Sequence, residues 1–141
     1  MKVLLLGVGM QGKVALHDLV QRGEVTQVLA ADQDFEALKA YVESGRYGRV
    51  RCEQLDATSP ESIERLMDWG PDVVIDLLPV TFHGRVAAAA VKQGVHLVNA
   101  SYAGPEVREL ADQARARDVT LLPEFGMDPG IDLVLLGEAV R

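Results

Sequence analysis

Six residues near the start of the chain have the types and spacing of a phosphate-binding loop. Residues 7–12 read Gly-Val-Gly-Met-Gln-Gly and match the pattern G-x-G-x-x-G. Here Gly7 would permit a tight turn, Gly9 would let the backbone approach a pyrophosphate, and Gly12 would let the following helix pack close to a sheet. The free N–H groups of Met10, Gln11 and Gly12 would face the phosphates. A glycine-rich turn without a ligand is the alternative.

A carboxylate follows the glycine loop at the position that discriminates between NAD and NADP in proteins with such a loop. Asp32 lies 20 positions after Gly12 and directly follows an apolar run, where an acid can accept hydrogen bonds from the adenosine ribose. A 2′-phosphate would meet Asp32 and Asp34, with no Lys or Arg at positions 33–36 to receive it. Like-charge repulsion therefore favours NAD over NADP as the cofactor. The alternative is an aspartate that only forms a turn.

Further polar and apolar residues follow the next predicted strands. Asp56 could reach the adenine amino group or could cap the next helix, and both alternatives stay open. An apolar exit from the fourth strand would line the cofactor channel, and its residues are Leu77, Leu78, Pro79 and Phe82.

Three residues are candidates for catalysis. Tyr102 and Asp128 follow the fifth and sixth predicted strands, so we expect them to meet near the nicotinamide ring. Such a pair suits a reaction that loses a hydride and a proton together. His83 titrates near neutrality and could exchange protons, although a histidine that opens a helix is more often simply exposed. The turn residues Pro129 and Gly130 could also just start the last helix.

The elements that must position these residues alternate along the chain. Short apolar runs predict six strands, at residues 3–6, 25–31, 50–55, 73–78, 95–99 and 119–122. Helical periodicity or capping signals between them predict helices at residues 10–22, at 35–43 after Asp34, from Pro60 after Ser59, at 84–93 and at 105–117. This alternation predicts an α/β Rossmann fold, a doubly wound parallel sheet of order 3-2-1-4-5-6 with helices on both faces.

Composition limits the classes of partner. The 141 residues carry a formal net charge of −7 and a single cysteine, Cys52. The negative charge argues against nucleic acid or an anionic membrane as the main partner, and one cysteine excludes an internal disulfide and a multi-thiolate metal site. No apolar stretch approaches the roughly 18 residues of a membrane-spanning helix. We expect a cytoplasmic protein with no metal.

The last residues form a predicted helix that is apolar nearly all round. Its apolar residues are Ile131, Leu133, Val134, Leu135, Leu136, Ala139 and Val140. A helix of this kind normally lies inside a larger protein. We therefore expect residues 1–130 to form one domain of a longer enzyme and residues 131–141 to begin the connection to the rest, or the chain to dimerise through this segment.

Three blocks in the second half resemble one protein family. They are residues 78–83, Leu-Pro-Val-Thr-Phe-His; residues 99–102, Asn-Ala-Ser-Tyr; and residues 124–132, Glu-Phe-Gly-Met-Asp-Pro-Gly-Ile-Asp. With the glycine loop, these blocks resemble the N-terminal cofactor domain of the saccharopine dehydrogenase and lysine 6-dehydrogenase family. The resemblance implies an NAD(P)-dependent oxidation of a carbon–nitrogen bond, with Tyr102 and Asp128 in the active site. In related reductases that use NADP, the second strand ends in Arg where this chain has Asp32.

The family resemblance also implies a second domain that supplies much of the substrate pocket and dimerises. We therefore expect a homodimer and an amino-acid substrate, lysine or saccharopine, with free lysine slightly preferred. The alternative from another class is a non-catalytic regulator that binds NAD as a signal, which would need no Tyr and Asp at the nicotinamide.

Overall fold

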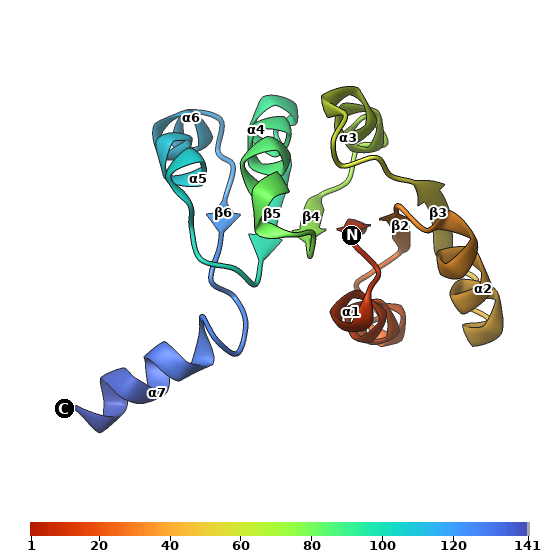
Figure 1. Ribbon diagram of the computed structural model, residues 1–141, viewed down its shortest axis with the longest axis horizontal. Coiled ribbons are helices and arrows are strands. Elements are labelled where there is room, and N and C mark those ends of the chain that lie inside the picture. Colours follow the sequence, from red (N-terminus) through yellow and green to blue (C-terminus); the bar gives the residue numbers. More distant parts are fainter. Residues whose placement is uncertain (141) are drawn as a thin grey trace.

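The structure is a computed structural model, and it describes residues 1–140. Six parallel strands form one sheet in the order β3-β2-β1-β4-β5-β6, which confirms the predicted Rossmann topology (Figure 1). The strands are β1 Lys2–Leu6, β2 Gln27–Asp32, β3 Val50–Gln54, β4 Val73–Asp76, β5 His96–Asn99 and β6 Leu121–Leu122. Strand order reverses between β1 and β4, so a ligand site is expected there, beyond the carboxyl ends of the strands.

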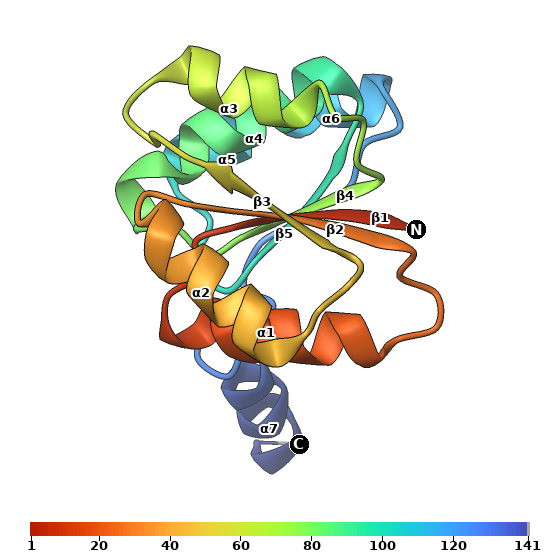
Figure 2. The same ribbon diagram turned by 90° about the vertical axis from the view of Figure 1, so that its right-hand side faces the viewer.

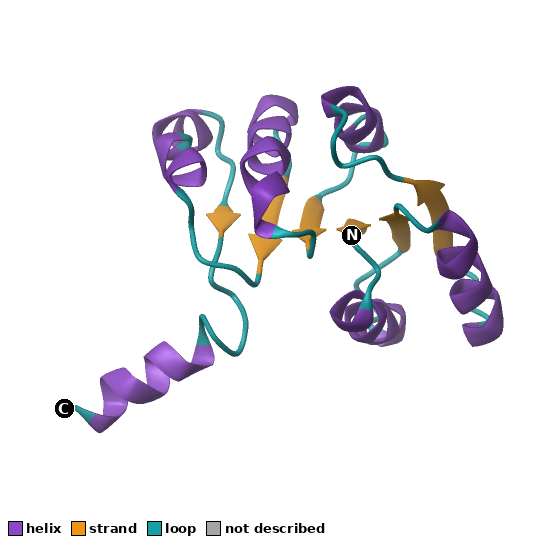
Figure 3. Cartoon of the chain, in the orientation of Figure 1, coloured by secondary structure: helices purple, strands orange, loops and turns teal. Residues whose placement is uncertain are grey.

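Helices cover both faces of the sheet, as Figures 2 and 3 show. The helices are α1 Met10–Gln21, α2 Phe35–Gly45, α3 Pro60–Met67, α4 His83–Gln93, α5 Pro105–Glu109, α6 Ala111–Ala116 and α7 Ile131–Ala139, with a 3₁₀ turn, η1 Val80–Phe82, before α4. Helices α1 and α2 lie on one face, and α3 to α6 lie on the other (Figure 2).

The central strand shows why the sheet is buried on both sides. Val3 and Leu5 pack into the core under α1 and α2, whereas Leu4 and Leu6 pack into the core under α3 and α4. All four side chains are fully buried. Because side chains alternate along a strand, a continuous apolar run is what a strand with two covered faces requires.

Two capping residues confirm the predicted helix starts. The Asp34 side chain accepts a hydrogen bond from the Ala37 N–H at 3.0 Å, and the Ser59 hydroxyl accepts one from the Ser62 N–H at 3.2 Å. Each satisfies an N–H group that the first turn leaves free.

Several predicted boundaries were wrong, and strand β6, predicted at residues 119–122, begins only at Leu121. Strand β2 begins at Gln27 and not at residue 25. Strand β4 ends at Asp76 and not at residue 78, because the Asp76 carboxylate accepts the Leu78 N–H at 3.1 Å and turns the chain. The predicted helix 105–117 is two helices, because the Leu110 N–H bonds to Val107, three residues back, and tightens the chain there.

Helix α7 projects away from the layered body (Figures 1 and 2). It contains no buried residue, and the apolar side chains along it are exposed. Residues 1–140 therefore leave this helix uncovered. Among the same residues, no helix is long and apolar enough to cross a membrane.

Candidate dinucleotide site

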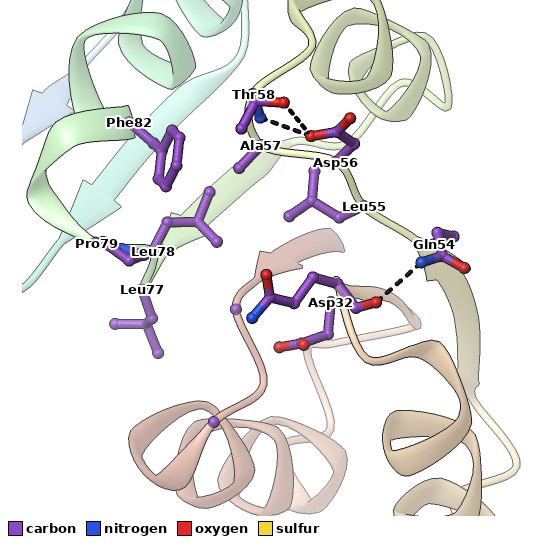
Figure 4. Close-up of a pocket in the computed structure, with 13 residues that line it drawn as sticks. Asp32, Gln54, Leu55, Asp56, Ala57, Thr58, Leu77, Leu78, Pro79 and Phe82 are labelled. Carbon is purple, nitrogen blue, oxygen red and sulfur yellow. Dashed lines mark hydrogen bonds between the residues drawn. The ribbon is translucent and has the colours of Figure 1, made fainter.

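A cleft of about 490 Å³ lies beyond the carboxyl ends of β1, β2, β3 and β4 (Figure 4). Its lining residues are Gly7, Gly9, Asp32, Gln33, Gln54, Leu55, Asp56, Ala57, Thr58, Leu77, Leu78, Pro79 and Phe82. We call this the first cleft. It lies where strand order reverses, the position that the topology predicts for a ligand.

The three glycines of the loop differ in what a side chain at each position would contact. Gly7 has a φ of +86°, and a Cβ there would lie 2.8 Å from the Leu77 carbonyl oxygen. A Cβ at Gly12 would overlap the carbonyl oxygen of Gly7. A Cβ at Gly9 would meet no atom within 4 Å. Gly7 and Gly12 are therefore required by the fold, whereas packing does not require a glycine at position 9, which borders open space in the first cleft; we call this space the Gly9 cradle.

Asp32 links the second strand to the glycine loop. Its carboxylate accepts the Val8 N–H at 2.6 Å and the Asp34 N–H at 2.9 Å, one on each oxygen. Each oxygen has further lone pairs, so the carboxylate can still accept hydroxyl groups of a ribose in the cleft. The turn alternative and the ligand alternative are thus compatible for this residue.

The first cleft has an acidic character. Asp32 and Asp56 are its charged lining residues, and no Lys or Arg lines it. A carboxylate accepts the hydroxyl groups of a ribose and repels a further negative charge placed directly beside it.

Asp56 forms a turn and does not cap the next helix. Its Oδ1 accepts the Thr58 N–H at 2.9 Å and the Thr58 hydroxyl at 2.6 Å. These bonds lower the pKa of Asp56, with the hydroxyl contribution largest. Ser59 is the cap of α3, so the capping alternative for Asp56 is wrong. The carboxylate lies at the rim of the first cleft near Thr58 and Ala57 (Figure 4).

A second cleft, of about 450 Å³, lies beyond β4 and β5. Its lining residues are Gln11, Asp76, Leu77, Leu78, Val80, Ala100, Ser101, Tyr102, Met127, Asp128 and Pro129. Leu77 and Leu78 line both clefts, so the two clefts adjoin at these residues along the edge of the sheet.

Tyr102 and Asp128 meet in the second cleft, as the sequence predicted. The Tyr102 hydroxyl donates to Asp128 Oδ1 at 3.1 Å. This bond is the main reason that the pKa of Tyr102 is raised, so the phenol stays protonated and remains a donor at neutral pH. The Tyr102 side chain is 57% exposed. The pair is therefore open to a ligand in the second cleft.

His83 lies under the wall between the clefts and is neither exposed nor part of a cleft lining. It is 3% exposed, and its Nε2 lies 2.8 Å from the Leu78 carbonyl oxygen. A carbonyl only accepts, so Nε2 carries the proton in this bond. The interpretation of His83 as an exposed helix-opening residue was wrong. Its burial also does not favour direct proton exchange with a substrate.

Comparisons with known proteins agree with this geometry. The family model described as "Saccharopine dehydrogenase NADP binding domain" matches residues 3–122. The chain belongs to this family. It is 31% identical over 130 residues to saccharopine dehydrogenase (NADP+, L-glutamate-forming) of Saccharomyces cerevisiae, covering 92% of this chain and 28% of that protein. It is 29% identical over 140 residues to mitochondrial alpha-aminoadipic semialdehyde synthase of Bos taurus, covering 99% of this chain and 15% of that protein.

A solved structure shows the same arrangement of the chain. Apo saccharopine dehydrogenase (L-Glu forming) from Saccharomyces cerevisiae superposes with a TM-score of 0.86 at 29% identity, over 99% of this chain and 30% of that chain. This member of the saccharopine dehydrogenase family and this chain share the whole described fold. The chain spans less than a third of the length of the curated relatives above.

The structure brings together most of the residues that the sequence singled out, and adds one. The exceptions are Met10, Gly12 and His83, which line neither cleft. The addition is Asp76, a buried carboxylate that lines the second cleft. A signal for it existed, because it is the one charged residue inside the apolar run of residues 73–78.

Proposed function

We propose that this chain is the dinucleotide-binding part of an NAD-dependent dehydrogenase that oxidises a carbon–nitrogen bond of lysine or saccharopine. The observation that carries the proposal is the path formed by the two clefts. It begins at the Gly9 cradle, passes Asp32, crosses Leu77 and Leu78, and ends at the Tyr102–Asp128 pair. This order, with the glycine loop first and the Tyr102–Asp128 pair last, is the one that a dinucleotide and a substrate need.

The first cleft would hold the adenosine and the pyrophosphate. The phosphates would lie against the N–H groups that open α1, where Gly9 leaves room for them. Asp32 would accept the ribose hydroxyls, and Asp56 would lie at the adenine. Leu78, Pro79 and Phe82 would provide the apolar wall.

The acidic lining supports NAD over NADP as the cofactor. The family description and the yeast relative's name specify NADP for those proteins. In this chain a 2′-phosphate would meet Asp32 with no lining cation to balance it. A shift toward NADP should therefore require removal of that carboxylate together with addition of a positive charge.

The second cleft would hold the nicotinamide and the reacting amine. A bound nicotinamide supplies a hydride acceptor. Oxidation of an amine removes a hydride from carbon and a proton from nitrogen, and the resulting imine is hydrolysed by water. The Tyr102 hydroxyl, whose one proton is donated to Asp128, would accept an N–H of the substrate through its oxygen, and the Asp128 carboxylate would orient that hydroxyl and accept a proton.

We also propose that residues 1–130 act as the cofactor domain and that α7 packs against a further folded unit or a second copy of the chain. The support is the exposed apolar surface of α7. Light scattering and the stability of longer forms of the protein would test this proposal.

Calorimetric titration with NAD and NADP tests the cofactor proposal. We expect NAD to bind more tightly, and the double variant Asp32→Ser, Gln33→Arg to shift preference toward NADP. Gly9→Ala should abolish binding while leaving the fold intact, because its Cβ points into the cradle. Absence of heat with either dinucleotide at millimolar concentration would refute the proposal.

Turnover tests the reaction. The full-length protein should reduce NAD with lysine or saccharopine as the amine. NAD binding without turnover on any amine would instead support the regulatory alternative.

A further inference from the structure

A buried acid and a buried histidine hold the backbone of one residue, Leu78, in the wall between the clefts. Asp76 ends β4 and is 1% exposed, and His83 begins α4 and is 3% exposed. Asp76 Oδ1 accepts the Leu78 N–H at 3.1 Å, while His83 Nε2 donates to the Leu78 carbonyl at 2.8 Å. Both polar groups of Leu78 are therefore bonded to side chains from two different elements.

The remaining polar atoms of the pair are not used by the described residues. Asp76 Oδ2 and His83 Nδ1 are buried and have no hydrogen-bond partner within residues 1–140. Asp76 Oδ2 lies 3.8 Å from His83 Nε2, beyond hydrogen-bond distance. Burial raises the pKa of Asp76 to about 6, and the neighbouring His83 opposes that shift only in part. A group arranged in this way costs stability, so packing does not explain its presence.

The neighbouring strand offers a comparison within the molecule. Asn99 ends β5 at the register position beside Asp76, and its Oδ1 accepts the Ser101 N–H at 3.0 Å. An amide side chain thus supports the same turn. The turn alone therefore does not require a buried acid at position 76, since an amide supports the same turn at position 99.

We propose that Asp76 and His83 are positioning residues that fix the backbone of Leu78 on both sides of its Cα, and with it the wall over which the cofactor passes from the first cleft to the second. This inference rests on the proposed function. Leu78 lines both clefts, so movement of its backbone would shift the nicotinamide end relative to the adenosine end. The pair would act on the nicotinamide half of NAD more than on the adenosine half.

Paired ligands and paired variants test the inference. The chain is titrated with NAD and with AMP, which fills only the adenosine half. Asp76→Val and His83→Leu remove one hydrogen bond each, whereas Asp76→Asn keeps an acceptor and His83→Gln keeps an N–H donor. His17→Leu is the control, because His17 is exposed on α1 and lines neither cleft.

We expect the removing variants to lose roughly tenfold in NAD affinity, as the loss of one buried hydrogen bond would give. Their AMP affinity should stay within about twofold of the wild type, and the conservative variants should recover most of the NAD affinity. Hydrogen exchange of the Leu78 amide should be faster in Asp76→Val. Wild-type affinity for NAD in both removing variants, or equal losses for NAD and AMP, would overturn the inference.

A pH series separates a positioning role from a structural one. Protonation of Asp76 leaves a neutral acceptor like that of an amide, so wild-type NAD affinity should fall below about pH 6 to the level of Asp76→Asn, whereas Asp76→Asn itself should show no such fall. The titratable group packed against Asp76 is His83 from α4, and Tyr102 and Asp128 line the same cleft; the flanking strands present Leu6 and Asn99, which do not titrate. Equal pH profiles would overturn the inference. Failure of the wild type to bind NAD would overturn the proposed function as well, whereas the other negative results leave it standing.

Discussion

The two clefts differ in how completely the described chain builds them. The first cleft is enclosed by loops that follow four strands and bond to one another, as when Asp32 accepts the Val8 N–H. The second cleft is bordered by large exposed side chains, among them Met127 at 73% and Tyr102 at 57% exposure, and leads toward the uncovered helix α7. The cofactor half of the site is thus self-contained, whereas the substrate half presents apolar surface that residues 1–140 do not cover.

This difference predicts which substitutions change both stability and ligand binding and which change the reaction alone. Most residues of the first cleft belong to the turns that close the sheet edge, so changing them alters the fold and the site together, with Gly9 as the exception. Residues of the second cleft contribute little to the packed core, so changing them should alter the reaction alone. Four substitutions test this contrast.

The largest effect on stability is expected at Gly12, in the glycine loop beside the first cleft. Gly12→Ala should lower the free energy of unfolding by about 3 kcal/mol, because the new Cβ overlaps the Gly7 carbonyl oxygen where α1 passes the loop. Chemical denaturation would measure the loss. The matched control is Gly9→Ala, which should change stability by less than about 1 kcal/mol. Equal destabilisation by both substitutions would contradict the separate roles assigned to the two glycines.

Asp76 lies at the border between the two clefts, and its ionisation should lower the free energy of unfolding. Its pKa is raised from 3.8 to about 6, so the folded state binds its proton more tightly than the unfolded state does. The contribution of Asp76 to stability therefore falls as pH rises from about 4 to about 6, and stays low above that range. A rise of the pKa from 3.8 to about 6 corresponds to about 3 kcal/mol in the free energy of unfolding. Asp76→Asn should remove this fall and be more stable than the wild type at pH 8 by about 2 kcal/mol.

Urea denaturation at a series of pH values would measure that difference. The comparison is made between variant and wild type because other carboxylates also titrate in this range. Parallel stability curves from pH 4 to pH 8 would show that the Asp76 carboxylate carries no such cost.

A smaller effect, confined to the reaction, is expected in the open half. Tyr102→Phe removes the hydroxyl that donates to Asp128. Because the side chain is exposed, thermal unfolding should be unchanged, and NAD affinity should stay the same. The rate of amine oxidation by the full-length protein should fall about tenfold, the effect of one lost hydrogen bond in the transition state. A loss of stability in this variant would break the contrast between the clefts.

The smallest effect on stability is expected on α7. Val134→Glu replaces an exposed apolar side chain, so the unfolding free energy of the chain should change by less than about 0.5 kcal/mol. If α7 packs against a second copy, light scattering should show weaker self-association in the same variant. A strongly destabilised monomer would mean that α7 packs on the body of the chain.

Local pattern predicted most of the fold, because each apolar run needed two covered faces and each helix had a capping or periodicity signal. The glycine loop, Asp32 and the meeting of Tyr102 with Asp128 followed from parallel strands ending at one edge. Pattern could not place His83, since its burial depends on a tertiary contact with Leu78. It also missed Asp76, because an acid in an apolar run reads as part of the strand until its bond to the Leu78 N–H is seen.

One local motif recurs at the edge of the sheet. Asp32, Asp56, Asp76 and Asn99 each follow or end a strand, and each accepts the N–H of the residue two positions later. The path of the main chain is therefore set by any short side chain with a suitable oxygen, leaving the formal charge at each position free to vary. An acid, an amide or a hydroxyl side chain can therefore be exchanged at these four positions, which changes the charge offered to a ligand while the backbone conformation is kept.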